Sequence, residues 1–132
     1  MYLYIDTTEK DSFDIALFDK ENVIKKKTVQ SHRKHSEKLL KSIEQILSSK
    51  KSSLKNIQGI IVVRGPGSFT SLRIGIATAN ALAFGLGVSI AGVGKHEDLD
   101  KIVSSIEKLF QRKPSIVIPK YGKEPHITES KK

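Results

Sequence analysis

The sequence predicts an α/β fold, a single lobe built on a mixed β-sheet of about five strands. Three observations predict it. β-prone segments fill most of the first thirty residues, apolar residues then recur with helical spacing, and strand-like apolar runs alternate with helical segments in the rest of the chain. A meander followed by β-α-β crossovers gives one sheet with helices packed on it. The chain has 132 residues, enough for one domain and too few for two ordinary ones.

The first three expected strands form an antiparallel meander. The opening residues MYLYID are β-prone, and in residues 13–18 every second side chain is strongly apolar, with Phe13, Ile15 and Leu17 on one side. The polar stretch DKEN then predicts a hairpin turn. The lysine-rich stretch VIKKKTV predicts an edge strand, because lysines discourage pairing with other chains.

The rest of the chain alternates helices and strands. The segment SHRKHSEKLLKSIEQILSSKK has an apolar stripe at three- and four-residue spacing and predicts an amphipathic helix, and IQGIIVV predicts a strand covered on both faces. A helix over 70–84 ending near Gly85 and Gly87, a strand over 89–93, a helix over 98–113 and a short strand over 115–119 follow. This βββ-α-β-α-β-α order is that of ribonuclease-H-like domains. Residues 1–119 are expected to form the lobe, and 120–132, without periodicity, a mobile basic tail.

Composition narrows the functional classes. Cysteine is absent, so the chain has no disulfide framework, thiolate metal site or catalytic thiol. No targeting segment and no apolar run of membrane-spanning length is visible, and we expect a soluble, cytoplasmic protein without a membrane partner. The net charge of +9 is uneven, since residues 23–73 hold twelve basic and two acidic side chains. Such a region favours an acidic or polyanionic partner, although solvated lysine faces give the same composition.

The glycine loop RGPGSFTSLR invites comparison with phosphate-binding loops. A P-loop needs Lys-Ser/Thr after its last glycine, where this chain has Phe69 and Thr70, and the dinucleotide fingerprint lacks its third glycine. The residues therefore favour a structural role. Gly65 and Gly67 permit a tight turn, and Ser68 or Thr70 would cap the helix that follows.

Two further candidate sites are weighed against simpler roles. A ribonuclease-H-like nuclease would need carboxylates on the first strand and at the end of the fourth. Asp6 could be the first, but the fourth strand ends in Arg64 rather than in a carboxylate. His32 and His35 have no third ligand nearby in the sequence. We therefore expect neither a catalytic site nor a bound metal.

The helix over 70–84 has almost no polar face. A helix that is apolar all round must be covered all round, and one sheet covers only one side of it. Gly75, Ala79 and Ala83, spaced by four, would form a smooth strip on which another helix can approach closely. The alternative is a helix packed entirely within the lobe, but the sequence favours an interface with another protein.

Three segments together resemble one family. IDTTEKDSFDIALFD, HSEKLLKSIEQIL and RGPGSFTSLRIGIATANALA are similar to the bacterial TsaB (YeaZ-type) proteins of tRNA threonylcarbamoyladenosine (t6A) biosynthesis. The resemblance covers residues 1–94, and its most specific part is the string from Gly65 to Gly75. Ser71 departs from the family's usual glycine, and the final IPKYGKEPHITESKK faintly resembles the Pro-x-Tyr tail of longer members.

The resemblance implies an actin-like (ASKHA) lobe that serves as a non-catalytic scaffold. It implies a TsaD-type partner bound through a two-helix face, a homodimer through the same face as an alternative, a TsaE-type ATPase in the wider assembly, and indirect contact with tRNA. The implied interface residues are Leu39, Leu40, Ile43, Ile46, Leu47, Leu72, Gly75, Ile76, Ala79 and Ala83.

The second lobe of longer members has no counterpart here, since about twenty residues separate Gly94 from Pro114. ATP binds between two lobes in the superfamily, so we expect no ATP site and no cofactor. Asp6, Thr7 and Thr8 resemble the superfamily's first phosphate motif. With Gly65, Gly67 and Ser68 they form the residual phosphate candidate.

A small basic RNA-binding module is the alternative function. It rests on the basic middle of the chain and on the lysines near its end. Aromatic residues make up 6% of the sequence and do not alternate with basic ones, so no base-stacking platform is indicated.

Overall fold

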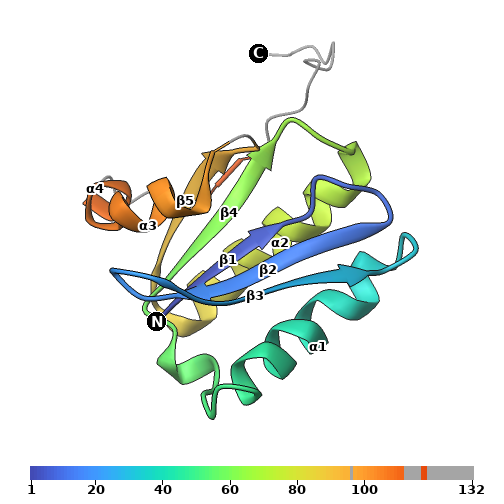
Figure 1. The fold of residues 1–132 in the computed structure, drawn as a ribbon. Helices are drawn as coiled ribbons and strands as arrows, with labels where there is room; N and C mark the ends of the chain where they lie inside the picture. Colours follow the sequence, from blue (N-terminus) through green and yellow to red (C-terminus); the bar gives the residue numbers. More distant parts are fainter. Residues whose placement is uncertain (96, 112–116, 119–132) are drawn as a thin grey trace.

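The structure is a computed structural model that describes residues 1–95, 97–111 and 117–118. Its elements are β1 (Tyr2–Asp6), β2 (Ser12–Phe18), β3 (Val23–Gln30), α1 (His35–Ser48), η1 (Leu54–Asn56), β4 (Gly59–Gly65), α2 (Phe69–Leu86), β5 (Ser89–Gly94), α3 (Leu99–Ser104) and α4 (Ile106–Gln111). Figure 1 shows one twisted sheet with α1 and α2 on one face and α3 and α4 on the other. The predicted α/β fold class is confirmed.

The five strands lie in the order β3-β2-β1-β4-β5. The meander β1-β2-β3 is antiparallel, whereas β4 and β5 run parallel to β1 because each is reached through a helical crossover. The predicted hairpin turn is present between β2 and β3. Asp19 accepts hydrogen bonds from the backbone N–H groups of Asn22 (2.7 Å) and Glu21 (2.8 Å), which lower the pKa of its carboxyl group.

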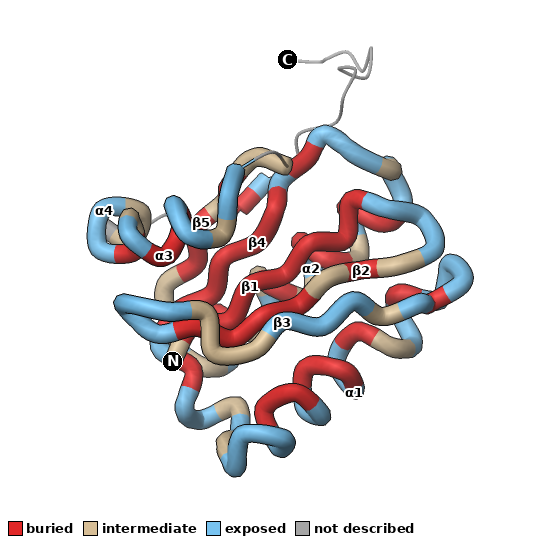
Figure 2. Tube along the Cα trace, viewed as in Figure 1, coloured by how far each residue is buried: buried red, intermediate tan, exposed pale blue. Residues whose placement is uncertain are grey.

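The larger core lies between the sheet and the helices α1 and α2. In α1 the buried positions recur every three or four residues, so Leu39, Ile43 and Ile46 all face the strands. Helix α2 faces them with Leu72, Ile76, Ala79 and Ala83. Figure 2 shows the burial concentrated on the inner strands and on the sheet-facing side of α1.

A second core lies on the opposite face, under α3 and α4. The ring of Tyr2 stacks between Phe18 (centroids 5.8 Å apart) and Phe110 (5.6 Å). Ile102, Val103 and Ile106 cover Ile61 and Val63 of β4 from the helix side. Both faces of β4 are therefore covered, as its continuous apolar run predicted.

Two helix boundaries and one helix cap differ from the prediction. The helix expected over 98–113 is divided at Ser105 (φ −108°, ψ 10°), a conformation that does not continue an α-helix. Helix α2 begins at Phe69, one residue earlier than expected, and Ser68 holds the N-cap position without a side-chain cap hydrogen bond, so the predicted hydroxyl cap is wrong. Gly87 ends α2 with φ of 69°, as the sequence indicated.

The end of the chain is described only in part. Val117 and Ile118 are not in a strand, and the other residues of the expected strand over 115–119 lie outside the described part. The expected tail over 120–132 lies outside it too.

Candidate functional site at the carboxyl edge of the sheet and on helix α2

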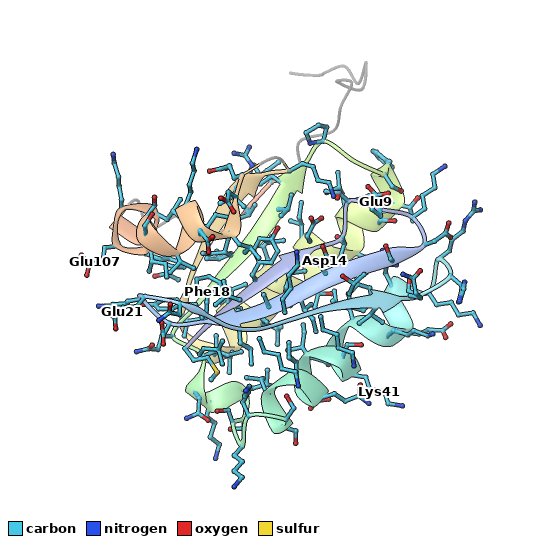
Figure 3. The ribbon with its side chains drawn as sticks, in the orientation of Figure 1. Glu9, Asp14, Phe18, Glu21, Lys41 and Glu107 are labelled. Atoms are coloured by element: carbon cyan, nitrogen blue, oxygen red, sulfur yellow. The ribbon has the colours of Figure 1, made fainter. Side chains whose placement is uncertain are left out.

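The three parallel strands β1, β4 and β5 all end at the same edge of the sheet. The segments that leave this edge are Thr7 and Thr8 after β1, the glycine loop after β4, and Lys95 after β5. Open α/β sheets bind their ligands just beyond such carboxyl ends. Figure 3 shows Glu9 at this edge, whereas Glu21 and Glu107 lie at the opposite end of the sheet.

Asp6 is the buried carboxylate of the edge, 7% exposed, and both of its oxygens are bonded. Oδ1 accepts hydrogen bonds from the backbone N–H of Thr8 (2.9 Å) and from its hydroxyl (2.7 Å). Oδ2 lies 3.3 Å from the Lys95 ammonium, which also lies 3.7 Å from a carboxylate oxygen of Glu9. The lysine thus supplies the positive charge that a buried carboxylate needs. The sequence reasoning missed Lys95, because nothing local to it signals a partner 89 residues away.

Of the six residues of the phosphate candidate, the structure brings Asp6, Thr8, Gly67 and Ser68 into contact with one another. The backbone N–H of Ser68 donates to the carbonyl oxygen of Thr8 (2.8 Å). A Cβ atom on Gly67 would lie 2.6 Å from Cβ of Thr8 and 2.8 Å from its Cα and carbonyl oxygen, so only glycine allows this approach. Gly65 has φ of 119°, a value that side chains disfavour. These contacts fit the structural role predicted for the loop.

The hydroxyl of Thr7 is buried without a hydrogen-bond partner. It points toward α2 rather than toward the edge, because a Cβ atom on Gly75 would lie 2.0 Å from it. Thr7, the residue that follows β1, thus occupies the space that a side chain at position 75 would need. Because Gly75 lies on the buried side of α2, it cannot form part of a surface on which another protein docks.

A hollow of about 430 Å³ opens beside the edge. Its charged lining is Arg64, Lys95 and Glu97, and Glu97 accepts a hydrogen bond from the backbone N–H of Gly94 (2.6 Å). Nearby Tyr4 is buried; desolvation, reinforced by the negative charges of Asp6, Asp14 and Glu97, raises its pKa well above the usual value. Its phenol is therefore neutral at physiological pH.

The histidine pair does not converge. His35 is buried beneath the edge of Phe13, its Nδ1 lying 2.6 Å from the Ser31 hydroxyl and its Nε2 2.9 Å from the carbonyl oxygen of Glu9. His32 is exposed. Among the residues that the structure describes, no group of three or more His, Cys, Asp or Glu side chains could hold a metal ion.

Nine of the ten predicted interface residues are buried inside the chain, so their assignment to an exposed docking face is corrected. They are Leu39, Ile43, Ile46, Leu47, Leu72, Gly75, Ile76, Ala79 and Ala83, and all of them lie on the sheet-facing sides of α1 and α2. Leu40 is the exception and is 45% exposed. The helix periodicity was read correctly, but its apolar stripe faces the chain's own sheet.

The outward face of α2 is nevertheless apolar. Ala77 and Ala81 are exposed, Phe69 is 50% exposed near one end of the helix and Phe84 is 92% exposed near the other. Arg73 is the charged residue between them, and its guanidinium lies 5.7 Å from the centre of the Phe69 ring. We call these five residues the outer α2 strip.

Comparison with known proteins agrees with this architecture. The sequence model of the TsaD family, described as tRNA N6-adenosine threonylcarbamoyltransferase, matches residues 22–118. The chain belongs to the TsaD/TsaB family. Within it the chain is of the TsaB (YeaZ) type, as the sequence motifs predicted. It is 39% identical over 71 residues to TsaB of Escherichia coli (50% of this chain and 31% of that protein) and 31% identical over 97 residues to TsaB of Bacillus subtilis (74% and 42%).

Transferases of the same family are also similar to this TsaB-type chain. The tRNA N6-adenosine threonylcarbamoyltransferase of Geotalea uraniireducens is 46% identical over 65 residues, which are 49% of this chain and 19% of that protein. The chain thus spans less than half the length of each of these relatives.

Solved structures confirm the fold of this TsaB-type chain. YeaZ from Pseudomonas aeruginosa superposes with a TM-score of 0.64 at 28% identity, over 70% of this chain and 43% of that one. Thermus thermophilus RuvC in complex with a Holliday junction superposes with a TM-score of 0.50 at 9% identity, over 72% and 66%. The ribonuclease-H-like lobe is therefore confirmed.

Helix α2 is, by length and composition only, apolar enough to cross a membrane (18 residues, mean hydropathy 1.2). The core helix of a soluble protein passes the same test. In this TsaB-type chain, one side of α2 is buried against the sheet.

Proposed function

We propose that this chain is a non-catalytic subunit of the t6A machinery in the bacterial cytoplasm, and that it binds a TsaD-type protein. Family membership supports the process, because its relatives are named as t6A biosynthesis proteins and threonylcarbamoyltransferases. The TsaE-type ATPase belongs to the wider assembly in this proposal.

The outer α2 strip is the proposed docking face, and it is the observation that carries the function. Ala77 and Ala81 are one turn apart, so a partner helix can approach the backbone closely between them. Phe84, 92% exposed, is a large apolar side chain of the kind that anchors protein interfaces. Leu40 on α1, the helix packed beside α2, extends the apolar area.

The contacts at the carboxyl edge support a scaffold rather than an enzyme. The oxygens of Asp6 are bonded to Thr8 and Lys95, and the glycine loop packs on Thr8. A buried carboxylate bonded in this way holds together the segments that carry its partners, which is a structural role. We therefore assign no catalytic or cofactor-binding residue.

Ala77→Arg is expected to abolish the complex with the cognate TsaD-type protein while leaving the chain folded. An uncompensated charge enclosed in an interface costs about 3–5 kcal/mol, which weakens binding by about 100-fold or more. Size-exclusion chromatography with light scattering on the mixed proteins measures the complex. Ser104→Arg is the matched control, because Ser104 is an exposed small residue of α3 on the other face of the sheet.

Two results would contradict the proposal. One is a full-strength complex formed by Ala77→Arg. The other is threonylcarbamoylation of tRNA that proceeds equally well without this chain. If the chain forms a homodimer in isolation and Ala77→Arg dissociates it, the strip serves a second copy instead of TsaD.

An RNA-binding surface is the second candidate, favoured by the lysines around β3 and α1. Lys26 and Lys27 are exposed on the edge strand, and Lys34 and Lys41 are exposed around α1, where Figure 3 shows Lys41 pointing away from the sheet. Among the described residues, Lys27, Lys34 and Lys41 form no ion pair. Their charge is thus available to phosphate groups.

The isolated chain should then bind tRNA with strong salt dependence. Three phosphate contacts predict a loss of about 40-fold in affinity between about 50 and 200 mM salt, because each contact releases condensed counterions. Filter binding at the two concentrations measures it, and Lys27→Glu/Lys41→Glu should reduce the slope. Absence of binding at the lower concentration would remove this candidate.

A further inference from the structure

Val117 lies between helix α2 and strand β5, where the side chain of Asn80 holds its backbone. The Val117 backbone N–H donates to Oδ1 of Asn80 (2.8 Å), and Nδ2 of Asn80 donates to the Val117 carbonyl oxygen (2.9 Å). One carboxamide thus bonds both backbone groups of one residue, as a neighbouring β-strand would. Within the described residues β5 pairs only with β4, and Val117 and Ile118 are not in a strand.

Arg64 and Gly92 complete the arrangement. Nε of Arg64 donates to the carbonyl oxygen of Ile118 (3.2 Å). The arginine reaches it by crossing β5 over Gly92, where a Cβ atom would lie 2.2 Å from Cδ of Arg64 and 3.0 Å from Cγ1 of Val117. The missing side chain at position 92 therefore makes room for the arginine stem and the valine together.

The side chains of Val117 and Ile118 lie in different surroundings, although the backbone of both residues is hydrogen-bonded. Val117 is 6% exposed and joins the larger core, whereas Ile118 is 63% exposed. Three polar contacts recognise main-chain atoms, and one small apolar space takes a β-branched side chain. Such recognition depends on main-chain groups and on one side chain rather than on a long sequence.

We propose that Asn80, Arg64 and Gly92 form a binding slot for a short peptide segment, and that Val117 and Ile118 of this chain are its resident occupant. Asn80 lies on α2 one turn from Ala77 and Phe84 of the outer α2 strip. The slot rests on its own contacts and does not depend on the proposed function. A tethered occupant has a high effective concentration, so a free peptide binds only when the resident segment is prevented from entering.

The test uses the full chain with its resident segment disabled. In Val117→Asp a carboxylate replaces the buried isopropyl group, so the segment leaves the slot. A labelled peptide of residues 113–120, KPSIVIPK, should bind this variant saturably and should not bind the unchanged chain detectably. Adding Asn80→Ala should weaken binding at least about tenfold, and a peptide with aspartate in place of the valine should not bind.

Two results of this titration would overturn the proposal. One is a folded Val117→Asp chain that does not bind the peptide. The other is binding that Asn80→Ala leaves unchanged.

Hydrogen exchange followed by NMR provides a test that does not need Val117→Asp to fold. In the unchanged chain the Val117 amide should be protected, because its N–H is bonded to Asn80. In Asn80→Ala it should exchange at least about tenfold faster while the amides of α1 keep their rates. Thr78→Ala, at a half-buried neighbouring position of α2, is the control and should change nothing at Val117.

An unprotected Val117 amide in the unchanged chain would overturn the proposal. So would a chain dimer that Asn80→Ala dissociates, because the slot would then hold a second copy's segment rather than the chain's own.

Discussion

Ile43→Asp is expected to unfold the protein. Ile43 lies in the larger core with 0% of its surface exposed, between α1 and the strands. Truncating a buried isoleucine costs about 2–5 kcal/mol, and enclosing a carboxylate without a partner adds several more. Domains of this size are stable by about 5–15 kcal/mol in total, so the substitution removes most or all of that margin. Circular dichroism during thermal unfolding measures the loss.

Leu40→Asp is the matched control on the same helix. Leu40 is 45% exposed on the opposite side of α1, so its replacement should change the free energy of unfolding by about 0.5 kcal/mol or less. If Ile43→Asp melts like the unchanged chain, α1 does not pack as the structure shows. If Leu40→Asp also unfolds, Leu40 is not exposed on α1 as the structure shows.

Ile43 also shows what the sequence could predict and what it could not. Helical spacing of Leu39, Ile43 and Ile46 correctly predicted a helix with one apolar face. The pattern is the same whether that face meets the chain's own sheet or a partner, so periodicity could not decide between them. The sheet decides, because the inward side chains of β2 need a cover and α1 supplies it, as α2 does for β4.

The carboxyl edge was predictable only in part. The glycine loop could be recognised as structural, because its sequence lacks the lysine and the third glycine of phosphate-binding loops. The ion pair of Asp6 with Lys95 and the bonds of Asn80 and Arg64 to residues 117 and 118 join positions 37 to 89 residues apart. Only the sheet order brings such residues together, and no local pattern encodes it.

Gly75→Ala is expected to destabilise the protein, although alanine is the better helix former. The new Cβ atom would lie 2.0 Å from the hydroxyl oxygen of Thr7 and 2.7 Å from its methyl carbon. Thr7 is 0% exposed, so Thr7 and α2 cannot move apart without opening the core. Overpacking of this kind costs about 1–3 kcal/mol, more than the roughly 1 kcal/mol that alanine gains in a helix. Urea unfolding measures the difference.

Gly85→Ala in the same helix should have the opposite sign. No atom lies within 4 Å of the position of its Cβ, so only the helix propensity changes, and stability should rise by about 0.5–1 kcal/mol. A double-mutant cycle with Thr7→Ala tests whether the contact with Thr7 causes the destabilisation by Gly75→Ala. Thr7→Ala removes the two side-chain atoms nearest to the new methyl group. If the clash with Thr7 is the cause, Gly75→Ala should cost less in the Thr7→Ala background. If the free-energy changes of the two substitutions simply add, the close contact between α2 and Thr7 is not the reason why position 75 requires glycine.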